Sequence, residues 1–309
     1  MTLSYITWDV SPEIVNIFGI SLRYYGIFFV GGLLTCIYFL GRFFKTENIP
    51  QENLEKLAIY GAIGVFVGAR LGHCLFYEPL YYLTHLGEML LPIIKMPDGS
   101  YKFIGYQGLA SHGGAIGLII AIVIYSRKTK ESALKTIDMM GIVAPLQGVF
   151  IRTANLLNSE IIGQPTDVPW AFIFKRVDDF PRHPAQLYEA LSYLAFFLIL
   201  LFIYRKKLVK LQTGIIFGLS ITLIFVARFF IEFVKEIQVD YEKDMLLDMG
   251  QILSIPFILV GISFIIYGIN RVKKGYIPYP AYQKSKRREK RNQKKIIFFT
   301  KKAAICILY

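Results

Sequence analysis

Residues 106–125 read YQGLASHGGAIGLIIAIVIY, in which a histidine and two adjacent glycines stand directly before an apolar run that ends at Tyr125. Similar apolar runs recur along the chain, and a bilayer core of about 30 Å needs about 20 mostly apolar residues per helix. We predict seven transmembrane helices, at about 20–41, 54–77, 108–125, 136–158, 187–204, 214–233 and 249–269. The pattern is therefore typical of an all-α, polytopic integral membrane protein.

The composition supports a membrane domain over soluble domains. The chain has 309 residues, of which 54% are hydrophobic and 18% are charged, whereas a soluble domain has about 25% charged residues. We expect one seven-helix domain over residues 1–270, followed by a basic tail at 271–309.

The distribution of basic residues predicts the orientation of the helices. The tail from Arg271 onward holds 13 of the 35 Lys and Arg residues, and the short loops that lie on the same side of the predicted bundle are also basic. Because cytoplasmic loops are enriched in Lys and Arg, we predict an outside N-terminus and a cytoplasmic C-terminus. The long loops 78–107 and 159–186 then lie outside, where loops that handle substrate are expected.

Several classes of function are disfavoured by the same composition. A basic tail that follows an apolar helix is more typical of contact with anionic lipid headgroups than with nucleic acid, so we expect membrane lipids as partners and no nucleic acid. The three cysteines form no CxxC pair and the four histidines form no HExxH motif. We therefore expect no disulfide framework, no metal and no other cofactor.

Ionisable residues inside the predicted spans are candidates for function, because a charge at a helix centre costs about 2.5 to 3.5 kcal/mol on insertion scales. Two of them, Arg23 and Asp138, lie near predicted helix ends and are expected to extend their charges towards water. A third, His73, is expected to pack as a neutral side chain. The others are Arg70, His112, Arg152, Glu189, Arg228 and Glu232, with Glu160 just beyond one helix end.

Two polar stripes stand out among these residues. Arg228 and Glu232 are four apart and share a helix face, which permits either a structural ion pair or an arginine oriented towards a ligand anion. Arg152, Asn155 and Asn158 are three apart, which favours a hydrated binding face, with hydrogen bonds between helices as the alternative. Two arginines facing one cavity would suit a phosphate group, and a phospholipid is the phosphate ligand available within a bilayer.

His112 is the candidate for proton transfer, since an imidazole with a pKa near 6.5 can accept a proton from a thiol or hydroxyl at neutral pH. Gly113 and Gly114 would let a headgroup or a peptide approach the backbone, or would serve close helix packing. Ser111 adjoins His112 but points about 100° away on a helix, and no GxSxG motif is present. We therefore expect the nucleophile to come from a substrate.

From Ser21 to Ile258 the chain resembles the prolipoprotein diacylglyceryl transferases of bacterial inner membranes. The resemblance rests on an ordered set of motifs: RYYG at 23–26, GARLGHCLFY at 68–77, GLASHGG at 108–114, RTANLLNSEIIGQPT at 152–166, RHPAQLYEA at 182–190, RFFIEF at 228–233 and MGQILSIP at 249–256. It implies a periplasmic location for loops 78–107 and 159–186.

The resemblance also implies an activity. Enzymes of this family move the diacylglyceryl group of phosphatidylglycerol onto the lipobox cysteine thiol of a preprolipoprotein signal peptide. They form a thioether and release glycerol 1-phosphate without a metal or nucleotide, in the first step of lipoprotein maturation.

Carried over by position, the resemblance implies catalytic roles for His112, Arg228 and Tyr25. We expect a second set of residues to bind substrate: Arg152, Asn155, Asn158, Glu160, Gly163, Glu232, Arg70, Gly113 and Gly114. Whether His112 takes the thiol proton or Arg228 stabilises a thiolate formed in solution stays open.

The chain departs from the family pattern at Ile151, Ala154, Leu156 and Ala115. These changes affect packing and remove no charged or proton-transferring group.

Two other functions remain as alternatives. A secondary transporter of an anionic substrate is the main alternative, although matching broken helices in two halves are not found. An intramembrane serine protease lacks a serine motif.

Overall fold

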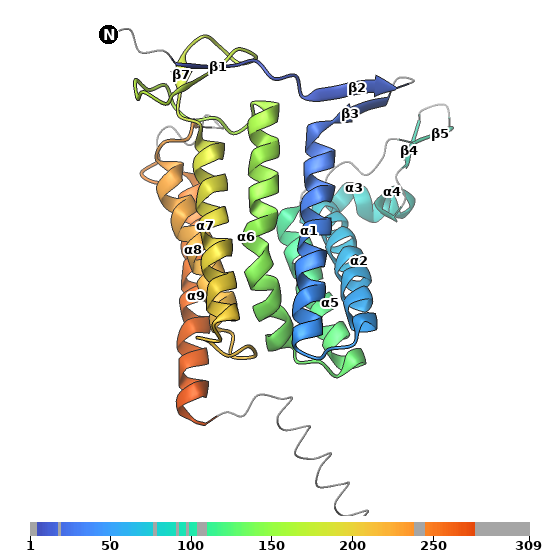
Figure 1. Cartoon of the computed structure of the whole chain (residues 1–309). Helices are drawn as coiled ribbons and strands as arrows, with labels where there is room; N and C mark the ends of the chain where they lie inside the picture. Colours follow the sequence, from blue (N-terminus) through green and yellow to red (C-terminus); the bar gives the residue numbers. More distant parts are fainter. Residues whose placement is uncertain are drawn as a thin grey trace, which may run out of the picture. The chain divides into compact units, whose positions relative to one another are not determined.

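The computed structural model describes residues 5–17, 20–76, 79–90, 93–96, 99–103, 110–237 and 245–275, and these are mostly helical (Figure 1). The helices are α1 (Tyr24–Thr46), α2 (Gln51–Phe76), α3 (Pro79–Thr84), α4 (Leu86–Leu90), α5 (Ser111–Thr129), α6 (Ala133–Asn158), α7 (Ala185–Arg205), α8 (Ile215–Glu232) and α9 (Met249–Lys273). The predicted helical membrane architecture is thus confirmed in its main feature.

Six helices in the described part of the chain are long and apolar enough to cross a membrane, namely α1, α2, α6, α7, α8 and α9. Their bounds lie close to six of the predicted spans. The predicted span 108–125 corresponds to α5, which is not among the six and whose predicted first two residues lie outside the described residues.

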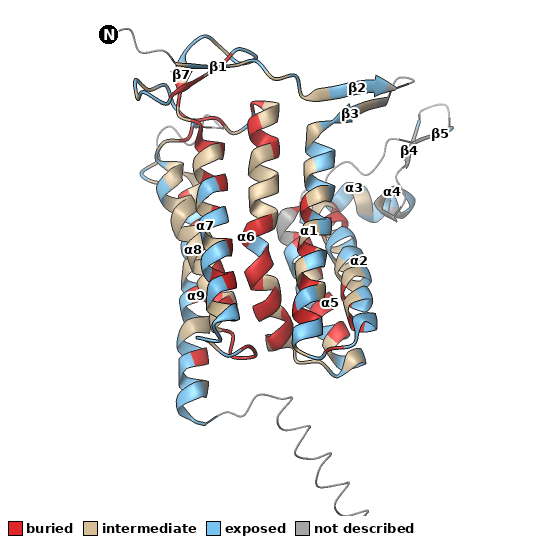
Figure 2. Ribbon diagram, in the orientation of Figure 1, coloured by how far each residue is buried: buried red, intermediate tan, exposed pale blue. Residues whose placement is uncertain are grey.

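Many residues along these helices are exposed (Figure 2), and many of the exposed residues are apolar. Leu34 in α1 is 61% exposed, Ile63 in α2 is 57% exposed and Leu259 in α9 is 59% exposed. Large exposed apolar surfaces are rare on soluble proteins and mark contact with protein or membrane. Lipid chains would cover such surfaces, as expected for a multi-pass membrane protein.

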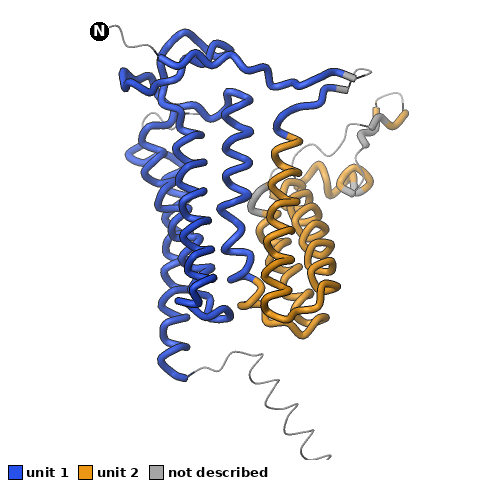
Figure 3. Tube along the Cα trace, viewed as in Figure 1, with its two compact units in different colours: residues 1–25, 137–309 blue, residues 26–136 orange. Residues whose placement is uncertain are grey.

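The chain forms two compact units, which Figure 3 distinguishes by colour. Unit 1 comprises residues 1–25 and 137–309, and unit 2 comprises residues 26–136. Helix α6 begins in unit 2 and runs on in unit 1. Unit 1 is therefore assembled from two segments that are separated in the sequence by the whole of unit 2.

Unit 2 is held together by close packing of α2 against α5. A Cβ on Gly68 would lie 2.8 Å from Gly117 Cα, and one on Gly72 would lie 2.7 Å from Gly113 Cα. The backbone N–H of Ala110 also donates to Ala69 O at 2.9 Å. Small residues let membrane helices approach this closely. Gly113 takes part in this helix packing, since its Cα faces α2, and its role in substrate binding stays a prediction.

The other elements of unit 2 are short. Helix α4 follows α3, and strands β4 (Ile93–Lys95) and β5 (Tyr101–Phe103) form an antiparallel pair. They belong to the long loop that the sequence analysis places outside.

Unit 1 carries small sheets that were not predicted. Strand β1 (Ile6–Trp8) pairs in parallel with β6 (Phe172–Phe174), and β6 pairs antiparallel with β7 (Pro181–Arg182). The Trp8 indole N–H donates to Leu156 O at 2.9 Å. Beneath the sheet, Phe172 and Phe174 pack with Leu156 and Ile162 in a buried cluster.

A hairpin corrects the predicted start of the first span. Strands β2 (Glu13–Ile17) and β3 (Ile20–Arg23) pair antiparallel, and α1 begins only at Tyr24. Arg23 is therefore the last strand residue, with Nη2 at 3.4 Å from Glu13 Oε1. It pairs across the hairpin instead of extending from a helix end.

Asp138 also differs from its prediction. Its side chain is fully buried in α6, and its carboxylate accepts the backbone N–H groups of Thr213, Gly214 and Phe217 at 3.0 to 3.1 Å. These N–H groups surround the start of α8, where the first backbone donors of a helix lack intrahelical acceptors. The charge is satisfied by a helix N-terminus rather than by water.

Candidate functional site

The polar stripe of α6 is the centre of the candidate site. Arg152 Nη1 donates to Asn155 Oδ1 at 3.2 Å, and Asn155 Nδ2 donates to Glu160 Oε2 at 3.2 Å. Asn158, the last residue of α6, donates to the other oxygen of Glu160, also at 3.2 Å. The four predicted residues thus form one continuous chain of hydrogen bonds.

Helix α7 supplies the main partner of Arg152. Glu189 is fully buried, and its Oε2 lies 2.6 Å from Arg152 Nε in an ion pair. Burying an arginine or a glutamate alone would be costly, so each stabilises the charge of the other. Glu189 therefore fixes where the guanidinium group lies at the end of α6.

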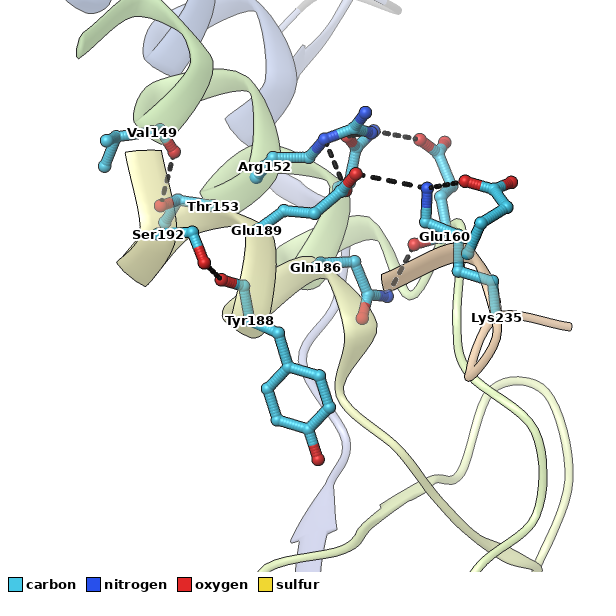
Figure 4. Close-up of polar contacts among 11 residues, drawn as sticks. Val149, Arg152, Thr153, Glu160, Gln186, Tyr188, Glu189, Ser192 and Lys235 are labelled. Atoms are coloured by element: carbon cyan, nitrogen blue, oxygen red, sulfur yellow. Dashed lines mark hydrogen bonds and ion pairs between the residues drawn. The ribbon is translucent and has the colours of Figure 1, made fainter. Parts of the chain in front are cut away.

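Lys235 extends this ion pair into a network (Figure 4). Its Nζ donates to Glu189 Oε1 at 3.1 Å and to Glu232 Oε2 at 2.9 Å. The lysine side chain is 4% exposed. Glu189 thus lies between two cations, one from α6 and one from the segment that follows α8.

The predicted pairing of Arg228 with Glu232 is wrong. Glu232 binds Lys235, and its carboxylate packs against Gly250 in the first turn of α9. No ion pair joins Arg228 to a carboxylate anywhere in the described ranges of the chain. Glu232 therefore does not orient Arg228, and the binding of an anion by Arg228 stays a prediction.

Tyr193 interacts with both arginines within unit 1. This buried α7 residue makes a side-chain hydrogen bond with Arg152, and the charges of Arg152 and Arg228 both act on its hydroxyl. A guanidinium group has five N–H donors. Because the described contacts of Arg152 engage only Glu189, Asn155 and Tyr193, donors remain for an anion.

The loop that carries Gly163 is packed too closely for a side chain. A Cβ on Gly163 would meet the Cβ and O atoms of His183 and lie 2.7 Å from Val234 O. The Gly163 N–H donates to His183 O at 2.9 Å. Gly163 therefore lets the loop after α6 pack directly against the segment after α8. This contact supports the candidate site.

Arg182 secures the same loop. Its guanidinium donates to Gly163 O at 3.2 Å and pairs with Asp178 and Glu236. The Arg182 hydrogen bond is the main reason that the pKa of the Asp178 carboxyl is lowered, and the same contact raises the pKa of Arg182. Burial lowers the pKa of the neighbouring His183.

The remaining predicted residues belong to α1, α2 and α5. Arg70, in unit 2, is buried and donates to the backbone oxygens of Glu88 at 2.6 Å and Met89 at 3.1 Å. Its guanidinium lies 5.0 Å from the centre of the Tyr82 ring. These contacts give Arg70 a role in holding α4 against α2.

Three further predictions concern helix starts. His112 is the second residue of α5, and its side chain lies outside the described part of the structure. Gly114 has room for a methyl group, because a Cβ there would lie 3.5 Å from Ala69 Cβ. Tyr25, the second residue of α1, is 37% exposed. No group of three metal-ligating side chains occurs among the described residues.

Comparison with known proteins shows the family. The model of the prolipoprotein diacylglyceryl transferase family matches residues 12–267. This chain belongs to that family. A phosphatidylglycerol–prolipoprotein diacylglyceryl transferase of Bacteroides fragilis is 51% identical over 262 residues, which cover 85% of this chain and 95% of the relative. The enzymes of the same name from Chloroherpeton thalassium and Porphyromonas gingivalis are 43% and 39% identical, and each aligns over 97% of its length.

The family assignment confirms the resemblance found in the sequence. The chain is a member of a transferase family, and the alternative of a secondary transporter is not favoured. The names of these relatives state two substrates, phosphatidylglycerol and a prolipoprotein.

Sequence reasoning missed two parts of this candidate site. Lys235 is not among the predicted residues, although its spacing of three from Glu232 could have indicated the pair. Gln186, which is fully buried in α7, donates from Nε2 to Glu160 O at 2.5 Å. Glu189 was recognised as a buried charge but was given no partner.

Proposed function

We propose that this chain transfers the diacylglyceryl group of phosphatidylglycerol to the lipobox cysteine of preprolipoproteins. The observation that carries the proposal is the pair of arginines in unit 1. Arg152 is held by Glu189 with donors to spare, and Arg228 has no carboxylate partner in the described ranges. Such cations suit the single negative charge of a phosphodiester.

In this mechanism Arg152 and Arg228 bind the phosphodiester and offset the charge that grows on the leaving phosphate. The cysteine sulfur attacks the diacylglycerol carbon that carries the phosphate ester. The carbon–oxygen bond breaks with its electron pair on oxygen, and glycerol 1-phosphate leaves as the carbon–sulfur bond forms.

We assign the thiol proton to His112, whose imidazole would accept it as sulfur attacks. We propose that Tyr25 acts at the reacting groups, and its match to the family motif supports this role. Asn155, Asn158 and Glu160 orient Arg152 through the hydrogen-bond chain described above. Gly114 lines the approach beside His112, and Gly163 and Glu232 shape the lipid site through their packing.

We further propose seven membrane spans, with α5 as the seventh. Helix α5 packs along α2 through Gly113 and Gly117, and α2 is itself a candidate span. Its Ile119 is 62% exposed, as suits a lipid-facing residue. The basic loops then place the N-terminus in the periplasm and the tail, 271–309, in the cytoplasm of a bacterial inner membrane.

One assay tests the function directly. The purified protein is incubated in detergent or vesicles with phosphatidylglycerol that is labelled in its acyl chains, together with a peptide that contains a lipobox cysteine. A transferase yields label in a thioether on cysteine and one glycerol 1-phosphate per product. Label that stays in phosphatidylglycerol, with the peptide unmodified, would contradict the proposal and revive the carrier alternative.

A further inference from the structure

Lys235 lies in a position that is fixed by its backbone as well as by its side chain. It follows the end of α8 and forms an isolated β-bridge with Gly163. On either side, Gln164 N donates to Val234 O at 2.8 Å and Glu236 N donates to Ile162 O at 3.1 Å. Because this segment is tied to the loop after α6, the Lys235 ammonium group is directed at the carboxylates of the site.

The ammonium group of Lys235 offsets the charge of Glu189, which would otherwise compete with the substrate phosphodiester for Arg152. Glu189 is buried beside Arg152, and a carboxylate that faced only this arginine would neutralise it. A phosphodiester could then bind the guanidinium group only by displacing a buried carboxylate from it. Lys235 shares the same carboxylate at 3.1 Å, which leaves one net positive charge on the group of three.

The charges of the whole site also show what Lys235 contributes. Its cations are Arg152, Arg228 and Lys235, and its carboxylates are Glu160, Glu189 and Glu232. The two sets balance. Without Lys235 the site would carry one excess negative charge. This charge would repel a bound anion strongly, because charges interact more strongly in a partly buried site than in water.

We propose that Lys235 is a positioning residue for lipid binding: its single positive charge, shared between Glu189 and Glu232, offsets part of their negative charge, so that more of the charge of Arg152 and Arg228 is kept for the phosphodiester. This inference rests on the proposed function and identifies a role for a residue outside the predicted site. Lysine suits the role, because its compact ammonium group can bridge two carboxylates.

The test compares four variants of the full chain: Lys235→Met, Lys235→Arg, Glu189→Gln, and the double variant with Glu189→Gln and Lys235→Met. Lys175→Met is the matched control, since Lys175 pairs with Asp179 at an exposed position. Initial rates are measured with phosphatidylglycerol varied at saturating lipobox peptide, and thermal unfolding is recorded for each variant.

We expect Lys235→Met to raise KM for phosphatidylglycerol about tenfold or more while kcat falls less than about threefold, because the lost charge acts on anion binding. Lys235→Arg should restore most of the affinity, and Lys175→Met should leave KM within about twofold of the original. The double variant should have a lower KM than Lys235→Met, because removing Glu189 also removes the uncompensated carboxylate.

Two results would overturn the inference. One is a folded Lys235→Met protein with an unchanged KM. The other is a double variant whose KM is raised by the product of the two single effects. If Lys235→Met alone does not fold, the double variant is compared with Glu189→Gln, and a KM about tenfold or more above that of Glu189→Gln would overturn the inference. Failure of the proposed function is seen separately, as a lack of thioether product with the unaltered chain.

Discussion

Gly113 in α5 lies with its Cα 2.7 Å from the position that a Cβ on Gly72 in α2 would occupy. The two glycines that precede the apolar run therefore have different surroundings. Gly113 is required where two helix backbones meet, whereas its neighbour Gly114 faces ordinary side-chain contacts.

Replacing Gly68 with alanine is expected to destabilise unit 2 by about 2 kcal/mol or more, because overpacking forces backbones apart. The new Cβ would meet Gly113 O and lie 2.8 Å from Gly117 Cα. Thermal unfolding in detergent measures the effect. Gly61→Ala is the control in the same helix, since a Cβ there would lie 3.7 Å from Leu118 Cδ1. Equal melting temperatures for the two variants would contradict the packing described for α2 and α5.

Arg152→Ala should lower transfer by about a hundredfold or more, because the phosphodiester loses a charged fork of donors and Glu189 loses its partner. Arg152→Lys should restore little, since an ammonium group does not bind two phosphate oxygens in parallel. Transfer rates with labelled phosphatidylglycerol measure both. A folded Arg152→Ala protein with unchanged rates would remove the arginine from the mechanism.

Arg228→Ala should be equally severe, by about a hundredfold, but should disturb the folded protein less than Arg152→Ala does. The reason is that no carboxylate in the described ranges forms an ion pair with Arg228. Comparing kcat/KM with the melting temperature separates the two arginines. A large loss of stability in Arg228→Ala would show an unrecognised structural partner.

His112→Gln should abolish transfer while phosphatidylglycerol binding remains, because glutamine can hydrogen-bond but cannot accept the thiol proton. Rate measurements and a lipid-binding assay on the same preparation distinguish the two effects. His73→Gln is the matched control, as His73 packs at the end of α2 with its ring 6.2 Å from that of Tyr82. Full transfer by His112→Gln would favour a thiolate stabilised by Arg228.

Asp138→Ala is expected to destabilise unit 1 by about 2 kcal/mol or more, since buried backbone donors at the start of α8 would lose their acceptor. Urea or thermal unfolding measures the loss. Asp167→Asn, at an exposed loop position, should change stability by less than about 0.5 kcal/mol. Similar stability of the two variants would argue against the cap seen at Thr213 and Phe217.

The Asp178–Arg182 pair predicts a dependence of stability on pH. The pKa of Asp178 is lowered by Arg182 in the folded chain, so the unfolded chain binds the proton more tightly. The pair's contribution is full above the unfolded value of about 3.9 and is lost as pH falls through the lower folded value. The difference in melting temperature between the original chain and Asp178→Asn should therefore be largest near neutral pH and should disappear in acid. Asp179→Asn, whose side chain is 84% exposed, should show almost no difference at any pH.

The helices were predictable because their signal is local. The predicted span 214–233 and helix Ile215–Glu232 nearly coincide, since an apolar run in a bilayer must satisfy its own backbone hydrogen bonds. The small sheets were not predictable in this way. Strand β1 has three residues and pairs with a strand more than 160 residues later, and no pattern within three residues specifies such a partner.

Several residues of the candidate site could be named from the sequence, but several of their contacts could not. The spacing of Arg228 and Glu232 correctly indicated a shared helix face, but Lys235 lies just past the helix end and takes Glu232. Tertiary structure explains why Glu232 pairs with Lys235 and not with Arg228, because the β-bridge with Gly163 directs Lys235 towards the carboxylates. Asp138 was misjudged for a similar reason, since its acceptor role depends on donors 75 residues away in sequence.

The parallel pairing of β1 with β6 has a consequence for how this protein is made. A ribosome delivers Ile6 long before Phe172, so the first strand has no partner until α1 to α6 have been synthesised. The sheet that closes over Leu156, next to the arginine site, is therefore completed late in translation. The opening residues therefore wait without a partner while the helices from α1 to α6 are made behind them.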